Sequence, residues 1–160
     1  MKSKDDDDDG DEETYDEYTE VVTNVTYATL TPKDGYDNIF IFLGGISDVS
    51  NKYFDFFKSK STFIPKGTKI YCLSGQPRKM AFMDYYYPQL AGQLFPGWFN
   101  VDQNGVLNPA NDFTQAKESL ELVLNEIDRI KDEENVDYKK IYLGGFSQGG
   151  DQLYFIKLKA

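Results

Sequence analysis

The chain of 160 residues contains no histidine and only one cysteine, Cys72. Without histidine it has no imidazole to act as a general base, to complete a Ser-His-Asp triad or to bind a metal ion. A single cysteine excludes an internal disulfide and any zinc or iron–sulfur site built from several cysteines. The composition therefore predicts no metal and no cofactor, and it removes the base on which the commonest hydrolytic chemistry depends.

Long apolar runs and targeting signals are also missing. No stretch of about 20 apolar residues is present, which argues against a transmembrane helix. The N-terminus lacks the apolar segment of a secretory signal and is too acidic for a transit peptide. From these absences the sequence predicts a cytoplasmic protein in a reducing environment.

Basic residues are few, with 17 Lys and Arg against 27 Asp and Glu and a net charge of −10. The excess of acid gathers in residues 1–20, which include the run from Asp5 to Asp9. Such a run repels itself and stays solvated, so we expect an acidic disordered tail over 1–20 and a globular domain over 21–160. The tail either solubilises the protein or docks on a basic partner. Its charge argues against nucleic-acid binding.

Three continuous apolar runs, at 38–43, 69–73 and 140–143, are typical of strands buried on both faces. A weaker alternation predicts a further strand over 21–30, and Asp34-Gly35 predicts a turn after it. Because helical patterns separate the later strands, the sequence indicates an α/β fold with a mostly parallel sheet flanked by helices.

Two helices and one long connection are predicted between these strands. Asp48 or Ser50 can cap a short helix that ends near Lys58. An amphipathic helix over 112–134 opens on a possible capping box of Asp112 and Gln115, with Phe113 on its apolar face. The connection at 74–111 is rich in proline and aromatic residues. These aromatic side chains either pack on the core or line a substrate site.

The pattern Gly145-x-Ser147-x-Gly149 directly follows the strand at 140–143. It is the nucleophile-elbow pattern, in which glycines permit a tight turn that lifts a serine hydroxyl above the edge of a sheet. The backbone amide of Gln148, at the start of the following helix, would then point towards a developing oxyanion. Its place between a strand and a helix makes the motif more specific than the pattern alone.

Several segments together resemble the carboxylesterase and acyl-protein thioesterase group of α/β-hydrolases. They are Phe42-Leu43-Gly44-Gly45-Ile46-Ser47-Asp48, Pro77-Arg78, Trp98-Phe99 and Gly145-Phe146-Ser147-Gln148-Gly149-Gly150. The resemblance covers residues 37–151. It implies that Ser147 is the nucleophile, that the amides of Ile46 and Gln148 form the oxyanion hole, and that the Trp98 loop lies near the acyl-binding side.

The sequence also departs from this group. Where the group has His-Gly, this chain has Gly44-Gly45, and the group's catalytic Asp and His lie well downstream of the elbow. Here the chain ends at Ala160, and Asp151, on the elbow helix, cannot replace the missing acid. We therefore expect a partial α/β-hydrolase fold with C-terminal strands missing and an exposed sheet edge that a protein partner covers.

Three accounts of function remain open. In the first, the chain is a catalytically impaired hydrolase-like protein that acts as a structural or interaction subunit of a larger assembly. In the second, it is a truncated form of an active serine esterase or thioesterase that hydrolyses acyl esters or thioesters through Ser147. In the third, the resemblance is accidental and the chain is an unrelated α/β binding protein. In each account the 160 residues alone lack meaningful turnover, because an unassisted serine hydroxyl is a poor nucleophile.

Overall fold

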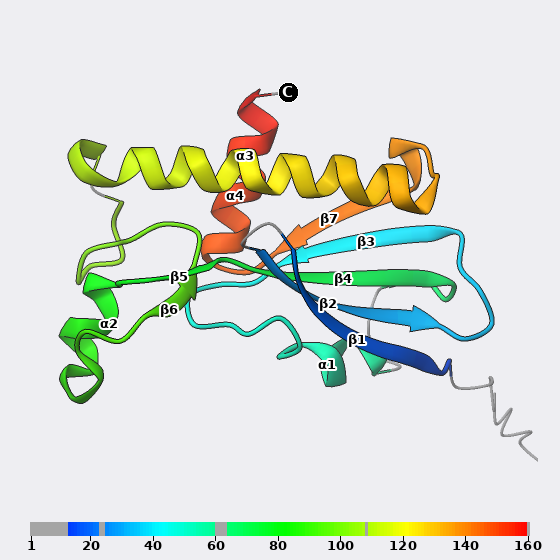
Figure 1. Cartoon of the computed structure of the whole chain (residues 1–160), viewed down its shortest axis with the longest axis horizontal. Helices are drawn as coiled ribbons and strands as arrows, with labels where there is room; N and C mark the ends of the chain where they lie inside the picture. Colours follow the sequence, from blue (N-terminus) through cyan, green and yellow to red (C-terminus); the bar gives the residue numbers. More distant parts are fainter. Residues whose placement is uncertain (1–12, 23–24, 60–63, 108, 160) are drawn as a thin grey trace, which may run out of the picture.

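The computed structural model describes residues 13–22, 25–59, 64–107 and 109–159. A five-stranded sheet forms its centre, with α1 on one face and α3 and α4 on the other (Figure 1). In spatial order the strands are β1 (Tyr15–Val22), β2 (Val25–Pro32), β4 (Thr68–Ser74), β3 (Asn38–Leu43) and β7 (Ile141–Gly145). The strands β4, β3 and β7 are parallel, whereas β1 and β2 pair antiparallel. The predicted α/β architecture is confirmed.

The strand β3 lies between β4 and β7, as its continuous apolar sequence requires. Its side chains alternate between two hydrophobic cores. Ile39, Ile41 and Leu43 pack with α3 and α4, whereas Phe40 packs on the other face with α1 (Phe54–Lys58). A strand with apolar residues on both faces is stable only where both faces are covered.

The N-terminal half of the sheet differs from the prediction. The single strand expected over 21–30 is divided between β1 and β2, which form a hairpin in which Val22 pairs with Val25. The predicted tail boundary at residue 20 falls inside β1, because Tyr15 already pairs with Pro32. Residues 1–12, with most of the acidic run, lie outside the described residues.

The helix α1 begins later than predicted, and neither predicted cap serves it. Its N-cap residue is Tyr53, without a side-chain cap hydrogen bond. Asp48 is instead buried and accepts a hydrogen bond from the backbone of Gly45. A carboxylate that is satisfied by a neighbouring loop is not available to cap a helix several residues later.

The long helix is α3 (Pro109–Glu134), which begins three residues before the predicted start. Proline suits the first helical position because its missing N–H has no partner there in any case. The side chain of Gln115 accepts a hydrogen bond from the Asn100 N–H at 2.8 Å. Phe113 is exposed rather than on the packed face.

The connection at 74–111 contains short elements rather than an irregular loop. They are β5 (Gln76–Arg78), α2 (Ala81–Tyr86), a 3-10 turn η1 (Pro88–Leu90) and β6 (Phe95–Gly97). The first alternative, packing on the core, holds for some of its aromatic residues. Trp98 and Phe99 are buried in the core, whereas Tyr85 and Tyr86 are exposed.

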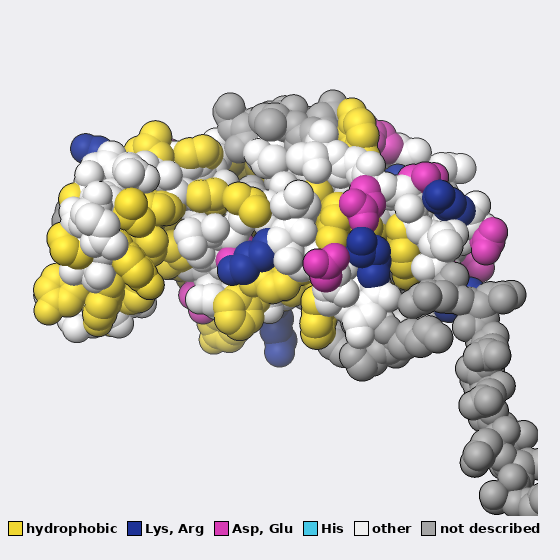
Figure 2. Space-filling model, turned by 90° about the horizontal axis from the view of Figure 1, so that it is seen from below, with side chains coloured by type: hydrophobic (Ala, Val, Ile, Leu, Met, Phe, Trp, Pro, Cys, Tyr) yellow, Lys and Arg dark blue, Asp and Glu magenta, His cyan; other side chains and the backbone are white. Residues whose placement is uncertain are grey.

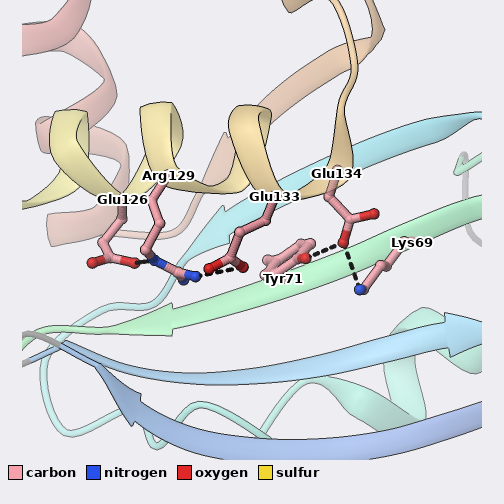
Figure 3. Close-up of polar contacts among 6 residues, drawn as sticks. All are labelled: Lys69, Tyr71, Glu126, Arg129, Glu133 and Glu134. Carbon is pink, nitrogen blue, oxygen red and sulfur yellow. Dashed lines mark hydrogen bonds and ion pairs between the residues drawn. The ribbon is translucent and has the colours of Figure 1, made fainter.

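A polar network attaches the end of α3 to the sheet (Figure 3). The carboxylate of Glu134 receives hydrogen bonds from Lys69 at 2.6 Å, from Tyr36 at 2.5 Å and from Tyr71. Burial would raise the pKa of Glu134, but these donors outweigh it and hold the pKa below its ordinary value. Burial, together with the hydrogen bond to Glu134 and the charge of that carboxylate, raises the pKa of Tyr36 to about 12. The network is therefore charged and intact at neutral pH.

Replacing Lys69 by Met tests this attachment. We expect the free energy of unfolding at pH 7 to fall by about 1–3 kcal/mol, because the largely buried carboxylate loses the cation with which it pairs. In the parent chain the contribution of Glu134 is present above its ordinary pKa of 4.5 and is lost as the pH falls through the lower folded-state value.

Chemical denaturation between pH 7 and pH 3 measures both effects. The control is Lys33→Met, which removes an exposed pair with Asp16 at 3.9 Å and should change stability by less than about 1 kcal/mol. Equal losses in the two variants would contradict a specific role for the Glu134 network.

Candidate active site

The turn between β7 and α4 (Gln148–Lys159) places Ser147 at the C-terminal end of the parallel strands. Ser147 has φ +53°, in the left-handed region that side chains other than glycine rarely adopt. Such a conformation costs of order 1–3 kcal/mol and persists only where the surrounding structure imposes it. The serine side chain is exposed, in keeping with an elbow that lifts it above the sheet.

Two glycines make this turn possible by allowing close backbone contacts. A Cβ on Gly149 would lie 2.0 Å from the carbonyl oxygen of Leu43, and a Cβ on Gly145 would lie 2.6 Å from the backbone of Gly149. Neither position can hold a side chain without moving main-chain atoms. The elbow is further joined to β3 by a hydrogen bond from the Phe146 N–H to the Leu43 carbonyl at 3.0 Å.

A second loop, residues 44–47, follows β3 and lies against the elbow; we call it the oxyanion loop. A Cβ on Gly45 would be 3.2 Å from the Ser147 Cβ, so the two loops are in direct contact. The loop is held by a hydrogen bond from the Ser47 N–H to the Pro96 carbonyl at 2.8 Å. Parallel pairing of β3 with β7 brings these two loops together, because both follow the same edge of the sheet.

Two backbone N–H groups predicted to form an oxyanion hole belong to these loops. Among the described residues, the N–H groups of Ile46 and Gln148 have no hydrogen-bond acceptor. Gln148 is the first residue of α4, whose initial N–H groups lack partners within the helix. The structure thus leaves two donors available, one on each loop beside Ser147.

The side chain of Gln148 has a separate structural task that the sequence did not reveal. It is buried, and its Oε1 accepts a hydrogen bond from the Trp98 N–H at 2.8 Å while its Nε2 donates to the Phe99 carbonyl at 2.5 Å. The Trp98 indole in turn donates to the Gly44 carbonyl at 2.8 Å. These contacts connect the elbow helix to the oxyanion loop through the segment after β6.

Asp48 is a second residue whose position sequence reasoning missed, since the sequence predicts it as a helix cap. Its side chain is only 3% exposed and accepts hydrogen bonds from the Gly45 N–H at 2.8 Å, the Tyr53 hydroxyl at 2.5 Å and the Lys52 ammonium. Burial would raise the pKa of Asp48, but these donors hold it below the ordinary value. Asp48 is therefore ionised at neutral pH.

A cavity of about 550 Å³ opens at Ser147. Its polar wall contains Ser47, Asp48, Lys52 and Asp151, and its apolar wall contains Phe82, Met83, Leu90 and Val101. Partial burial raises the pKa of Asp151. Beyond the apolar wall, hydrophobic side chains gather at the α2 end of the molecule (Figure 2), where Tyr85, Tyr86 and Leu94 are exposed.

Within the described part of the chain, no group of three or more His, Cys, Asp or Glu side chains could hold a metal ion. The single cysteine, Cys72, is buried in β4, and burial raises the pKa of its thiol to about 12. Among the described helices, none is both long enough and apolar enough to cross a membrane.

No family model matches the sequence, and no curated protein matches it either. Several solved structures have a similar fold, and two of them are the following. Acyl-protein thioesterase 2 from Zea mays has a TM-score of 0.53 at 17% identity, covering 79% of this chain and 48% of its own. A variant of SOBER1 from Arabidopsis thaliana has a TM-score of 0.50 at 18% identity, covering 72% of this chain and 51% of its own.

This chain has part of an α/β-hydrolase fold. It spans about half the length of each of these two proteins. The predicted fold class is therefore confirmed.

Gly149→Ala should destabilise the protein by about 1–3 kcal/mol, because its Cβ would overlap the Leu43 carbonyl oxygen. Gly150→Ala is the matched control. Its Cβ would be 3.8 Å from the Gly145 carbonyl oxygen, and alanine is favoured over glycine in a helix by about 0.5–1 kcal/mol. Thermal unfolding measures both; similar behaviour of the two variants would contradict the tight elbow packing.

Proposed function

We propose that this chain carries the nucleophile and the oxyanion-binding groups of a serine hydrolase that acts on acyl esters or thioesters. The observation that carries this proposal is the strained Ser147, at φ +53°, exposed to a cavity beside two backbone donors without partners. Strain of this kind persists only where the surrounding contacts impose it, and such residues cluster at active sites. The name of the Zea mays protein supports the thioester class.

In the proposed reaction, the Ser147 hydroxyl oxygen attacks the acyl carbonyl carbon and a base accepts its proton. The carbonyl oxygen becomes an oxyanion, which the N–H groups of Ile46 and Gln148 stabilise. Loss of the alcohol or thiol leaves an acyl-serine, which water then hydrolyses. The apolar wall beside Phe82 and Met83 would take the acyl chain.

The base must come from outside these 160 residues if it is a histidine, since the sequence contains none. Without a base the serine hydroxyl stays protonated and attacks slowly, although oxyanion stabilisation alone can support some reaction. Imidazole added to the solution can take the place of the missing side chain.

A fluorophosphonate probe tests the proposal. We expect slow labelling of Ser147 by the 160-residue chain, accelerated about 10- to 100-fold by imidazole and abolished in Ser147→Ala. Peptide mass spectrometry identifies the labelled residue. Labelling that survives in Ser147→Ala, or no labelling of the folded parent chain in saturating imidazole, would contradict the proposal.

A second candidate function, as a non-catalytic interaction subunit, is favoured by the open edge of the sheet. In the described residues β7 has a neighbour on one side only. Tyr142 and Phe146 are more than half exposed, and Leu143 is 38% exposed. An apolar groove of about 620 Å³ lies beside them, lined by aromatic residues that include Phe40, Phe42 and Phe56.

We propose that a further strand, parallel to β7 and supplied by another polypeptide segment, occupies this edge. The crossover from β4 through α3 to β7 passes β3 and moves towards this edge, and α4 packs on the same face as α3. A crossover of the same hand through α4 reaches the open side of β7. The aligned part of this chain covers only 48% of the Zea mays protein and 51% of SOBER1, which leaves room for such a segment. A basic partner for the residues 1–20 stays a separate prediction.

Leu143→Lys tests whether the open edge of β7 is the surface through which the chain associates. An unpaired apolar edge should make the isolated chain self-associate and bind an apolar dye, and a lysine at position 143 should reduce both. Tyr18→Lys, on the exposed β1 at the opposite edge, is the matched control and should change neither. Sedimentation and dye fluorescence measure the effect. Equal effects of both substitutions, or a parent chain that neither associates nor binds dye, would contradict this role.

A further inference from the structure

The carboxylate of Asp48 lies directly behind the oxyanion loop. Its Oδ2 accepts the Gly45 N–H at 2.8 Å, and a Cβ on Gly45 would lie 3.3 Å from the same oxygen and 3.2 Å from the Ser147 Cβ. Gly45 is thus held between the carboxylate and the nucleophile. The main chain of Asp48 is also fixed, because its carbonyl accepts the Ser74 hydroxyl at 3.0 Å.

This arrangement creates an electrostatic problem for the proposed chemistry. The buried negative charge of Asp48 is hydrogen-bonded to Gly45, the residue before Ile46. It would therefore oppose the formation of an oxyanion at the Ile46 N–H. The opposition matters because the Coulomb energy between two charges rises as the distance between them falls. Asp48 and Ser147 line the same cavity. The carboxylate of Asp48 therefore keeps the oxyanion loop in shape, but the negative charge of that carboxylate must be compensated.

Lys52 is placed to provide that compensation. Its ammonium forms an ion pair with Asp48 Oδ1, on the oxygen that Gly45 and Tyr53 leave unoccupied. Half of the Lys52 side chain is exposed, so the ammonium stays hydrated in part while Asp48 is buried. Lys52 also lines the cavity beside Ser147. Asp151, in the same wall, is the other acidic group there.

We propose that Asp48 and Lys52 form a charge-compensated pair in which Asp48 positions the oxyanion loop and Lys52 neutralises its charge at the oxyanion. This inference rests on the proposed function. Neither residue touches the reacting atoms, so both are positioning residues. Asp48 holds the Gly45 N–H by a hydrogen bond, and Lys52 reduces the negative electrostatic potential at Ser147.

A double-substitution cycle separates charge from structure, with the imidazole-assisted labelling rate of Ser147 as the readout. Lys52→Met should slow labelling about tenfold, because it leaves the buried carboxylate uncompensated. The double variant Asp48→Asn with Lys52→Met should recover to within about threefold of the parent chain. With its amide oxygen in the place of Oδ2, the asparagine can still accept from the Gly45 N–H and the Tyr53 hydroxyl, while its amide nitrogen takes the place of the oxygen that Lys52 bound.

Lys58→Met is the matched control, because this lysine of α1 pairs with Glu17 at 2.7 Å and does not line the cavity. It should leave the labelling rate unchanged. A purely structural role predicts instead that the double variant is as slow as Lys52→Met or slower. That result, or no effect of Lys52→Met, would overturn the proposed compensation.

Amide exchange of Gly45 by NMR tests the positioning role without any chemistry at Ser147. Exchange should become at least about tenfold faster in Asp48→Ala, which removes the acceptor, and stay unchanged in Lys52→Met. Unchanged exchange in Asp48→Ala would overturn the positioning role. Failure of the proposed function is a different outcome, because the parent chain then shows no Ser147 labelling while the Gly45 exchange pattern still holds.

Discussion

The contact between the elbow and the end of β3 is the constraint on which the rest of the site depends. The Phe146 N–H donates to the Leu43 carbonyl, and Gly149 approaches the same carbonyl so closely that no Cβ fits between them. Two loops that follow neighbouring parallel strands are thereby joined at one edge of the sheet. Once this contact forms, the turn at Ser147 has no room to relax, which explains how a non-glycine residue remains in the left-handed region.

Three further polar contacts hold the segments around that junction. Gln148 connects the elbow helix to the segment that carries Trp98, the Trp98 indole binds the Gly44 carbonyl, and Asp48 binds the Gly45 N–H. All are buried, so each would be costly if its partner were absent. Preorganised donors contribute to catalysis because they need no rearrangement when charge develops. Under the proposed function, these contacts would hold the N–H groups of Ile46 and Gln148 in place.

The two edges of the sheet differ in character. At one edge, β1 carries acidic side chains, and Glu17 pairs with Lys58. Charge at an edge strand discourages pairing with other chains. At the other edge, β7 has no charged residue and exposes tyrosine and leucine beside an aromatic groove. This asymmetry favours association at β7 and connects the two proposed roles, catalysis and interaction, because the elbow begins where β7 ends.

Much of this architecture could be predicted from local patterns. The apolar runs of β3, β4 and β7, the amphipathic α3 and the motif around Ser147 are each visible within a few consecutive residues, since backbone periodicity and turn chemistry are local properties. The start of β1 was not visible, because its acidic sequence is typical of a solvated tail and only pairing with β2 makes it a strand. Asp48 looked like a helix cap because an Asp before a short apolar helix is typical of a cap. Its true partners, Gly45, Lys52 and Tyr53, are assigned only when the chain has folded. Sequence alone specified the apolar strands β3, β4 and β7, the turn at Ser147 and the absence of histidine. Only the tertiary structure decided which polar groups meet behind the oxyanion loop, because the local spacing around Asp48 also permits a helix cap and its burial selects between the two arrangements.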